Sequence, residues 1–428
     1  MTDPNANRPG YKETKVGWIP EEWECVPLGA LFTESKEKGE AGHQTYSVTM
    51  DRGLIPRGEL DRKMAPDLPP DQSLMVRAGD VVYNMMRMWQ GSVALAECDC
   101  VVSPAYVVCK PREEVSSDFY LLYFKSFEGL YRLWRYSYGV TNDRLRLYFP
   151  DFSLVPAPRP PYPEQTKIAE ILSANDRVIE RTEALIAAKR RQKRALMQQL
   201  LTGKRRLAGF DGDWSQVCLG EVFRERKEIN RNHSKLLAVT SGKGIVPADT
   251  LDKKDSSSSD KSKYKYIRKG DLGYNTMRMW QGVSDISKYD GIVSPAYTVC
   301  IPSKELDGPF IAHLFKLPEI INLFWRYSQG LVDDTLNLKF NNFSLIKIKL
   351  PDRNEQSAIS NVLDTADREI ETLESKLAAL RRQKQALMQR LLTGRVRVES
   401  DTSDGSDWSD KADKAKKTDG IRQGEGST

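Results

Sequence analysis

Residues that build metal centres and disulfide frameworks are scarce in this sequence. Its 428 residues include only six cysteines and three histidines, and the histidines stand far apart at His43, His233 and His313. Cys98 and Cys100 form one C-x-C pair with no second pair to complete a zinc site. So few thiols exclude a disulfide framework at this length and favour a cytoplasmic protein. We therefore predict that this chain binds no metal.

Long hydrophobic runs are missing as well. No stretch approaches the roughly 18 uninterrupted apolar residues of a membrane-spanning helix, and the N-terminal residues are polar rather than apolar. Neither a membrane partner nor a secretory signal is expected. The hydrophobic content of 39% and the charged content of 29% are typical of globular proteins. A chain of this length is expected to form two or more hydrophobic cores.

Catalytic motifs are also lacking. Thr240–Gly244 superficially resembles a phosphate-binding loop, but it lacks the first glycine at the required spacing and the Ser or Thr after the lysine. Pro160-Pro161-Tyr162 lacks the leading Asp, Asn or Ser of the motif with which amino-methyltransferases hold a flipped base. No nucleophile–base pair or glycine-rich methyl-donor loop stands out. The sequence therefore predicts no catalytic residue, no cofactor in this chain and no enzymatic activity of its own.

Charge is unevenly distributed along the chain. The formal net charge is +6, but residues 398–428 carry 5 Lys/Arg and 8 Asp/Glu, a net of −3, which leaves the rest of the chain at +9. A basic body suits a polyanionic partner such as nucleic acid. A mildly basic surface without special meaning is the alternative interpretation. The final segment contains almost nothing apolar, so we predict that it is disordered.

A duplication organises the rest of the sequence. Tyr83 begins the segment YNMMRMWQG and Tyr274 begins YNTMRMWQG, at a shift of 191 residues (274 − 83 = 191). A constant shift maintained without a gap is not expected by chance, so the chain contains two copies of one unit. The same shift relates Ser103–Tyr106 to Ser294–Tyr297, Trp134–Ser137 to Trp325–Ser328, Arg190–Lys193 to Arg381–Lys384, and Leu200–Gly203 to Leu391–Gly394.

Each copy has a globular part followed by a helical part. Short apolar runs such as Asp80–Tyr83, Val101–Val102 and Tyr106–Cys109 predict strands, and Phe119–Tyr136 predicts a helix. The helical parts begin after Pro163 and Pro351 and contain neither Gly nor Pro until Gly203 and Gly394. We predict an α+β fold with globular domains at 1–160 and 204–350, long helices at 161–203 and 351–397, and the polar tail at 398–428.

The helical parts have a seven-residue repeat. In the second copy, Leu363, Ile370, Leu377, Lys384 and Leu391 lie seven apart, with Ala366, Leu373, Leu380 and Leu387 between them. This spacing is typical of a coiled-coil seam. The first copy has a weaker seam, because Asn175, Thr182 and Lys189 interrupt its second row. We expect the two helices to pair with each other as an antiparallel coiled coil, as two copies related by an approximate two-fold axis would.

In this order, these motifs resemble the specificity subunit of type I restriction-modification enzymes. Gly17–Trp23 resembles the opening of that family, and Asn84–Gly91 followed by Ser103–Tyr106 resembles the interior of its target-recognition domain. Pro163–Gln165 and Leu200–Gly203 resemble the exit into and out of its long spacer helix. The second copy matches throughout, except that Asn354 replaces the proline before Glu355. The likeness covers about residues 11 to 398.

The resemblance implies a function without catalysis. Each target-recognition domain would read one half of a split site in double-stranded DNA, and the paired helices would set the distance between the halves. Two adenine methyltransferase (M) subunits would dock on the chain and bring S-adenosylmethionine. Motor-nuclease (R) subunits using ATP and Mg²⁺ would join them.

Eight residues are the candidates for DNA contact, four in each copy. Arginine can hold a phosphate or a guanine, and glutamine can read adenine. Because the two half-sites can differ, residues shared by both copies are better candidates for backbone contact than for base reading. The alternative interpretation is that Met88 and Trp89 belong to the core and that Arg87 is a buried structural partner. The candidates are Asn84, Arg87, Gln90 and Arg135, with Asn275, Arg278, Gln281 and Arg326 as their counterparts.

Two further interpretations stay open at this stage. The basic run Lys189–Arg194 and its counterpart Arg381–Lys384 could contact DNA or a partner, although such runs are more often solvated helix faces. The whole chain could instead be a coiled-coil scaffold whose globular domains bind protein, or a methyltransferase with an unrecognised site.

Overall fold

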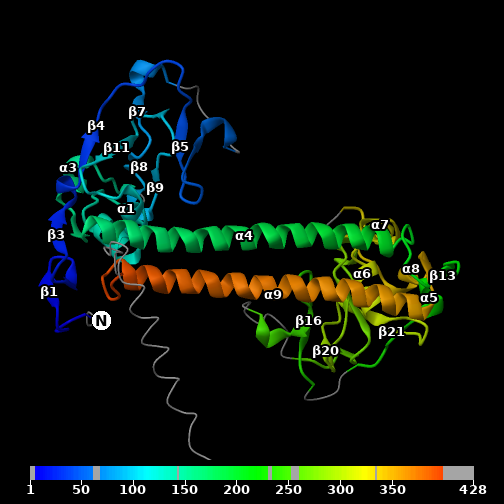
Figure 1. Ribbon diagram of the computed structural model, residues 1–428. Coiled ribbons are helices and arrows are strands. Elements are labelled where there is room, and N and C mark those ends of the chain that lie inside the picture. Colours follow the sequence, from blue (N-terminus) through cyan, green and yellow to red (C-terminus); the bar gives the residue numbers. More distant parts are fainter. Residues whose placement is uncertain are drawn as a thin grey trace, which may run out of the picture. The chain divides into compact units, whose positions relative to one another are not determined.

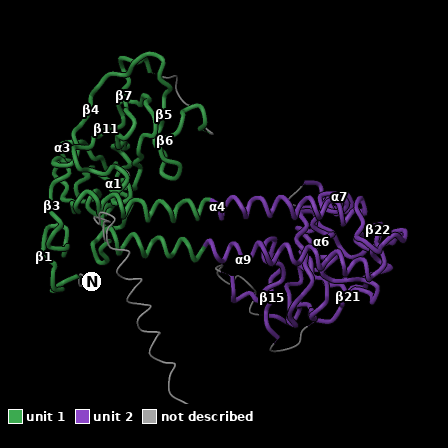
Figure 2. Tube along the Cα trace, in the orientation of Figure 1, with its two compact units in different colours: residues 1–180, 378–428 green, residues 181–377 purple. Residues whose placement is uncertain are grey.

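The computed structural model describes residues 5–60, 68–141, 144–229, 234–251, 260–332 and 335–398. These residues form two compact units, one made of residues 1–180 with 378–428 and the other of residues 181–377 (Figure 2). Each unit therefore contains one end of each long helix. None of the helices in the described ranges has the length and apolar character needed to cross a membrane. The polar tail predicted from residue 398 onward lies, beyond Val398, outside the described residues.

The first unit is built on a four-stranded antiparallel sheet in the order β4-β11-β8-β9. Three short helices follow the sheet in sequence, and two-stranded pairs surround it (Figure 1). The strands are β1 (Tyr11–Thr14), β2 (Gly17–Pro20), β3 (Glu24–Pro27), β4 (Phe32–Ser35), β5 (Tyr46–Val48), β6 (Leu54–Pro56), β7 (Leu74–Val76), β8 (Val81–Asn84), β9 (Val93–Leu95), β10 (Cys100–Val102), β11 (Tyr106–Pro111) and β12 (Pro156–Arg159). The helices are η1 (Leu28–Ala30), η2 (Arg57–Glu59), η3 (Pro70–Gln72), η4 (Met88–Gln90), α1 (Ser117–Phe124), α2 (Phe127–Arg135), α3 (Phe149–Leu154) and the start of α4 (Tyr162–Leu200).

The second unit repeats this plan with the sheet order β14-β21-β18-β19. Its strands are β13 (Ser215–Cys218), β14 (Phe223–Glu225), β15 (Leu237–Thr240), β16 (Gly244–Pro247), β17 (Lys265–Ile267), β18 (Leu272–Asn275), β19 (Ser284–Ile286), β20 (Gly291–Val293), β21 (Tyr297–Pro302) and β22 (Lys347–Leu350). Its helices are α5 (Leu219–Val222), η6 (Ala248–Thr250), η7 (Met279–Gln281), α6 (Gly308–Leu314), α7 (Pro318–Tyr327), α8 (Phe340–Phe343) and the start of α9 (Arg353–Leu391). The predicted α+β fold with two repeated domains and two long helices is confirmed.

The central strands are apolar on both faces, because each face of the sheet meets its own core. In β8, Val81 and Tyr83 join the larger cluster that contains Trp23 and Phe152, whereas Val82 joins a smaller one. Side chains of successive strand residues point to opposite faces, so an uninterrupted apolar run is what a doubly covered strand requires. Cys109 and its counterpart Cys300 are both fully buried in the larger cores.

The predicted helix over Phe119–Tyr136 is in fact two helices. α1 ends at Phe124, and Ser126 begins α2, because its hydroxyl accepts a hydrogen bond from the Gly129 amide at 3.0 Å. Gly129 is required there, since a Cβ at this position would stand 2.0 Å from the carbonyl oxygen of Tyr123. The long helix α4 begins at Tyr162 and takes Pro163, after which the sequence pattern places the helical part, into its first turn, where proline loses no helical hydrogen bond.

The predicted seams match the observed burial of both long helices. Leu363, Ile370 and Leu391 are buried, and the remaining seam positions of α9 are half-buried between exposed neighbours. In α4, Leu172, Thr182, Ile186 and Leu200 are buried in the same register. Within each unit the helices run antiparallel, because the start of one packs with the end of the other: Ile168 and Leu172 with Leu391 in the first unit, Leu200 with Ile359 and Leu363 in the second.

Ion pairs between the long helices use part of the basic run. In the second unit, Lys189 Nζ lies 2.7 Å from Glu369 Oε2, and Lys193 Nζ lies 2.5 Å from Asp367 Oδ2. The counterpart of the second pair, Lys384 with Asp176, joins the helices of the first unit. Arg190 meets Glu374 in the same way. These residues of the run therefore pair the helices and are poorer candidates for DNA contact than the sequence alone indicates.

Both units contain a buried aspartate at the same position, but only the second unit pairs it with an arginine. In the second unit, Asp271 forms a bidentate pair with Arg226, at 2.7 Å from Nε and 2.9 Å from Nη2, and both residues are buried. In the first unit the counterpart Asp80 is equally buried, but Ser35 replaces the arginine. Asp80 accepts a hydrogen bond from the Arg77 amide. Burial without a cationic partner in contact raises the pKa of Asp80 above its usual value.

Replacing Asp80 with asparagine is expected to change the free energy of unfolding more favourably at neutral pH than at acidic pH. A carboxyl whose pKa is raised on folding stabilises the folded state below its unfolded pKa of about 3.9, and this contribution is lost as the pH rises through the folded pKa. Asparagine does not titrate and can still accept the Arg77 amide. The free energy of unfolding of Asp80→Asn relative to the parent, measured by urea denaturation between pH 4 and 7, should therefore increase with pH. Asp271→Asn is the matched control, which should be destabilised because Arg226 loses its charged partner.

Candidate nucleic-acid interface

The shared motif forms the same turn at the end of a central strand in both units. β8 ends at Asn84 and β18 at Asn275, and each asparagine accepts a hydrogen bond from the amide two residues ahead at 3.0 Å. A short 3₁₀ helix follows, and it ends at Gly91 or Gly282, whose φ values of 86° and 74° are left-handed. Glycine suits this position because other residues are strained there. The motif therefore fixes a rigid turn.

Buried methionines anchor this turn and leave its arginines exposed. Met88 and Met279 are fully buried, and the indole N–H groups of Trp89 and Trp280 donate to the carbonyls of Met86 and Met277 at 3.2 and 3.0 Å. The methionines are thus core residues, as the alternative interpretation of the motif holds. The same interpretation is wrong for arginine, because Arg87 and Arg278 are exposed.

Arginine and glutamine of the motif are paired with each other. Arg87 Nη1 donates to Gln90 Oε1 at 3.1 Å, and Arg278 Nη1 donates to Gln281 Oε1 at 3.4 Å. Bidentate reading of adenine uses both the oxygen and the nitrogen of a glutamine amide, and here the oxygen already accepts one hydrogen bond from the arginine. What the pair presents outward is a set of N–H donors on a positive charge. This chemistry suits phosphate oxygens better than a particular base.

The turn of the second unit borders a wide groove. Asn275, Arg278 and Gln281 line a cavity of about 1520 Å³ together with β15, the residues that follow β16 and the segment Ser294–Tyr297. A smaller hollow on the same turn is lined by these three residues with Trp280 and Tyr297. The structure therefore brings together three of the four candidates of the second copy. Arg326 is exposed at the end of α7, and it does not line either hollow.

In the first unit, Arg135 occupies the corresponding end of α2. It is exposed, and its guanidinium carbon lies 5.9 Å from the ring centroid of Tyr131. Tyr131 in turn stacks on Trp134 with ring centroids 6.1 Å apart. An exposed arginine beside exposed aromatic rings is compatible with a nucleic-acid backbone or base stack. The eight candidates thus remain predictions, and all of them are at least partly accessible.

Sequence reasoning missed the hairpin side of the groove. Its lining includes charged and polar residues that the two copies do not share, and no local motif distinguishes them: Lys235, Ser241, Asp249 and Lys263. The repeat itself supplies a signal for them. Once the groove is known, subtracting 191 from the number of each lining residue gives its counterpart in the first copy and shows which lining residues differ.

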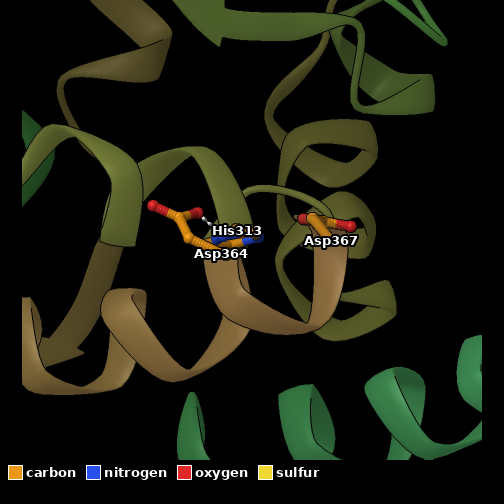
Figure 3. A group of neighbouring side chains, drawn as sticks. All are labelled: His313, Asp364 and Asp367. Atoms are coloured by element: carbon orange, nitrogen blue, oxygen red, sulfur yellow. Dashed lines mark hydrogen bonds and ion pairs between the residues drawn. The ribbon is translucent and has the colours of Figure 1, made fainter. Parts of the chain in front are cut away.

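One histidine lies beside two aspartates in the second unit. His313 Nε2, on α6, lies 2.8 Å from Asp364 Oδ1 on α9, and Asp367 stands one turn further along the helix (Figure 3). The three ligand atoms lie within 4.8 Å of one another, and their types are those that zinc accepts. Lys193 already holds both oxygens of Asp367 at 2.5 Å. Leu122 and Ser173 are the counterparts of His313 and Asp364, and we interpret the pair as a contact that fastens α6 to α9.

Comparisons with known proteins agree with this architecture. A curated relative, the type I restriction enzyme MjaVIII specificity subunit of Methanocaldococcus jannaschii, is 23% identical over 91% of this chain and 96% of its own length. The putative MjaX specificity subunit of the same organism is 22% identical over 91% of this chain and 97% of its own length. A solved S subunit of a type I restriction-modification system from M. genitalium has the same fold, with a TM-score of 0.53 at 14% identity over 86% of this chain and 96% of that one.

The family model matches twice, once in each copy of the duplication. Residues 20–188 and 211–382 each match the type I restriction modification DNA specificity domain. The two matches begin 191 residues apart, at the shift that relates the two copies of the sequence. Together they cover most of the 428 residues. The chain therefore belongs to the type I restriction modification DNA specificity family.

Proposed function

We propose that this chain is the DNA-reading subunit of a type I restriction-modification complex, in which each unit binds one half of a split DNA site. The observation that carries the proposal is the rigid turn that recurs in both copies, with an exposed Arg–Gln donor pair beside Asn84 or Asn275. In the second unit this turn borders a groove. Two turns of identical chemistry suit two contacts with one repeating polyanion.

Catalysis in this proposal belongs to partner subunits. Two adenine methyltransferase subunits would dock on the chain and bring S-adenosylmethionine, and motor-nuclease subunits would bring ATP and Mg²⁺. The family match and the relatives named as specificity subunits support a role in recognition. A purified chain is therefore expected neither to methylate nor to cut DNA, and methyl transfer without added subunits would contradict the proposal.

A domain exchange tests the division of labour between the copies. Residues 204–350 would be replaced with the equivalent part of a relative that has a different target, and the methylated sites of cells carrying the hybrid and its methyltransferase would be sequenced. One half of the recognised site should change and the other should stay the same. A simultaneous change in both halves would show that the units do not read independently.

Salt separates DNA reading from a protein-scaffold function. If the chain neutralises several phosphates, the logarithm of its DNA affinity falls linearly with the logarithm of salt concentration, with a slope of about −0.9 per phosphate. A scaffold whose globular domains bind protein instead would show no DNA affinity with this salt dependence. Fluorescence anisotropy with a labelled duplex, between about 50 and 200 mM salt, gives this slope directly.

Replacing Arg278 with alanine is expected to weaken binding of every DNA sequence by a similar factor. Arg278 is exposed, is shared by both copies and presents donors suited to phosphate, so its loss should cost affinity without changing the recognised site. The salt slope should fall by about 1 if one phosphate contact is lost. Lys288, which is exposed and does not line the groove, is the matched control. A change of preferred sequence in Arg278→Ala would instead make this residue a base reader.

A further inference from the structure

The groove of the second unit has one side that both copies share and one side that they do not. The shared side is the turn formed by Asn275, Arg278 and Gln281, whose counterparts in the first copy are identical. The other part of the lining, which we call the hairpin wall, comes from β15, the chain next to it and the segment that follows β16. The charged and polar residues of the hairpin wall that differ between the copies are Lys235, Ser241, Asp249, Asp260, Lys263 and Tyr264, and their counterparts are Gln44, Met50, Gly58, Pro69, Gln72 and Ser73.

This division separates residues that can discriminate from residues that cannot. A turn that is identical in both copies can hold DNA but cannot make the two copies read different sequences. Only residues that differ between the copies can do so. If the groove binds DNA as proposed above, on which this inference rests, the hairpin wall is where base discrimination belongs.

Within the hairpin wall, Lys235 and Asp249 form a charged pair that changes as a unit. Lys235 Nζ lies 3.7 Å from Asp249 Oδ2, and the two side chains are 53% and 70% exposed. Both are replaced by uncharged residues in the first copy, Gln44 and Gly58. An exposed pair at this distance contributes little to folding. Its charges are therefore free to serve recognition, and substitutions there are expected to leave the fold intact.

The carboxylate is the more informative of the two charges. An acidic group in a groove that receives a polyanion lowers affinity, because it repels phosphate. The carboxylate becomes favourable where a base offers a hydrogen-bond donor. In the major groove cytosine N4 is such a donor, and Asp and Glu accept from it. The lysine ammonium has only donors, which match the O6 and N7 acceptors of guanine. The ammonium and the carboxylate together match the guanine and the cytosine of one G·C base pair.

We propose that Lys235 and Asp249 read a G·C base pair in the half-site bound by the second unit. Lys235 donates to guanine O6 or N7, and the Asp249 carboxylate accepts from cytosine N4. The first unit, which has Gln44 and Gly58 at these positions, imposes no such requirement there. The unequal charge of the two hairpins thus gives each copy a different target although their shared turns are the same.

The test uses the full chain together with its methyltransferase partner. The half-site of the second unit is first assigned by exchanging residues 204–350, and sites methylated in cells are then sequenced for four proteins: the parent, Lys235→Gln with Asp249→Gly, Lys235→Arg, and Lys243→Gln. The double variant carries the residues of the first copy. Lys235→Arg keeps guanine donors in place. Lys243 belongs to the same hairpin but does not line the groove, so Lys243→Gln is matched for loss of charge.

The double variant should lose about 5- to 150-fold discrimination at one G·C pair of the assigned half-site, the range expected for one good base contact. Lys235→Arg should retain that preference, and Lys243→Gln should leave the recognised sequence unchanged. An unchanged site in the double variant overturns the assignment of Lys235 and Asp249. So does relaxation in the other half-site or at several positions at once. A parent protein that recognises no split site would instead contradict the proposed function itself.

Discussion

Replacing Glu355 with alanine is expected to lower the free energy of unfolding of the second unit by about 2–4 kcal/mol, because a fully buried carboxylate and three hydrogen bonds are lost together. Glu355 has no exposed surface. It accepts from Arg206 Nε at 2.5 Å, from Arg206 Nη2 at 2.7 Å and from the Trp214 indole N–H at 3.3 Å. Its removal leaves the indole without this acceptor and the guanidinium without its counter-charge.

The first unit contains the same arrangement and supplies an internal replicate. Glu164 accepts from Arg397 Nε at 2.8 Å, from Arg397 Nη2 at 2.9 Å and from the Trp23 indole N–H at 2.9 Å. Glu164→Ala should therefore destabilise the first unit in the way that Glu355→Ala destabilises the second. Native-state hydrogen exchange follows each unit separately. Glu371, exposed on α9, is the matched control, and a loss of equal size in Glu371→Ala would show that the effect does not come from burial.

Replacing Arg226 with serine is expected to destabilise the second unit by about 3–5 kcal/mol, because it leaves a buried carboxylate without its partner. Serine is the residue that the first unit has at this position, Ser35. Asp271 would then resemble Asp80, whose pKa burial raises. The loss should be largest at neutral pH and should decrease as the pH falls and the carboxyl is protonated.

A second substitution separates the two causes of that loss. In Arg226→Ser, the further change Asp271→Asn should recover part of the stability, since it removes the buried charge and keeps an acceptor for the Arg268 amide, which lies 2.7 Å from Asp271 Oδ2. Arg224→Ser, at an exposed position two residues away, should change the free energy of unfolding by less than about 0.5 kcal/mol. If the double variant is less stable than the single one, the guanidinium contributes mainly by packing.

The features that repeat along the sequence were predictable from it. The 191-residue shift, the seam register of both helices and the position of the shared motif follow from local spacing and from comparing the chain with itself, whereas the turn that this motif forms was not predicted. Thr182 shows why the weaker seam could still be predicted. This polar residue is buried because its heptad position faces the partner helix.

Features that depend on contacts between distant residues were not predictable. His313 meets Asp364 across 51 residues, and Glu164 meets Arg397 across 233. No local pattern pairs them, although the recurrence of Glu164 as Glu355 and of Arg397 as Arg206 at the common shift was an available signal. The exposure of Arg87 could not be read from the motif either, because methionine, tryptophan and arginine in one short turn allow either a buried or an exposed arginine.

Residues near the start and the end of the described chain contact each other in the first unit. Asn5 Nδ2, Arg8 Nη1 and the Tyr11 hydroxyl donate to the carbonyls of Thr393, Arg395 and Gly394. In the second unit, residues 202–207 are the counterpart of residues 393–398, and they continue directly into residues 208–214, the counterpart of residues 17–23. Circular permutants that join residue 398 to residue 5 and open within residues 208–213, most of which are exposed, are therefore expected to keep the contacts of both units, which hydrogen exchange of each unit would check.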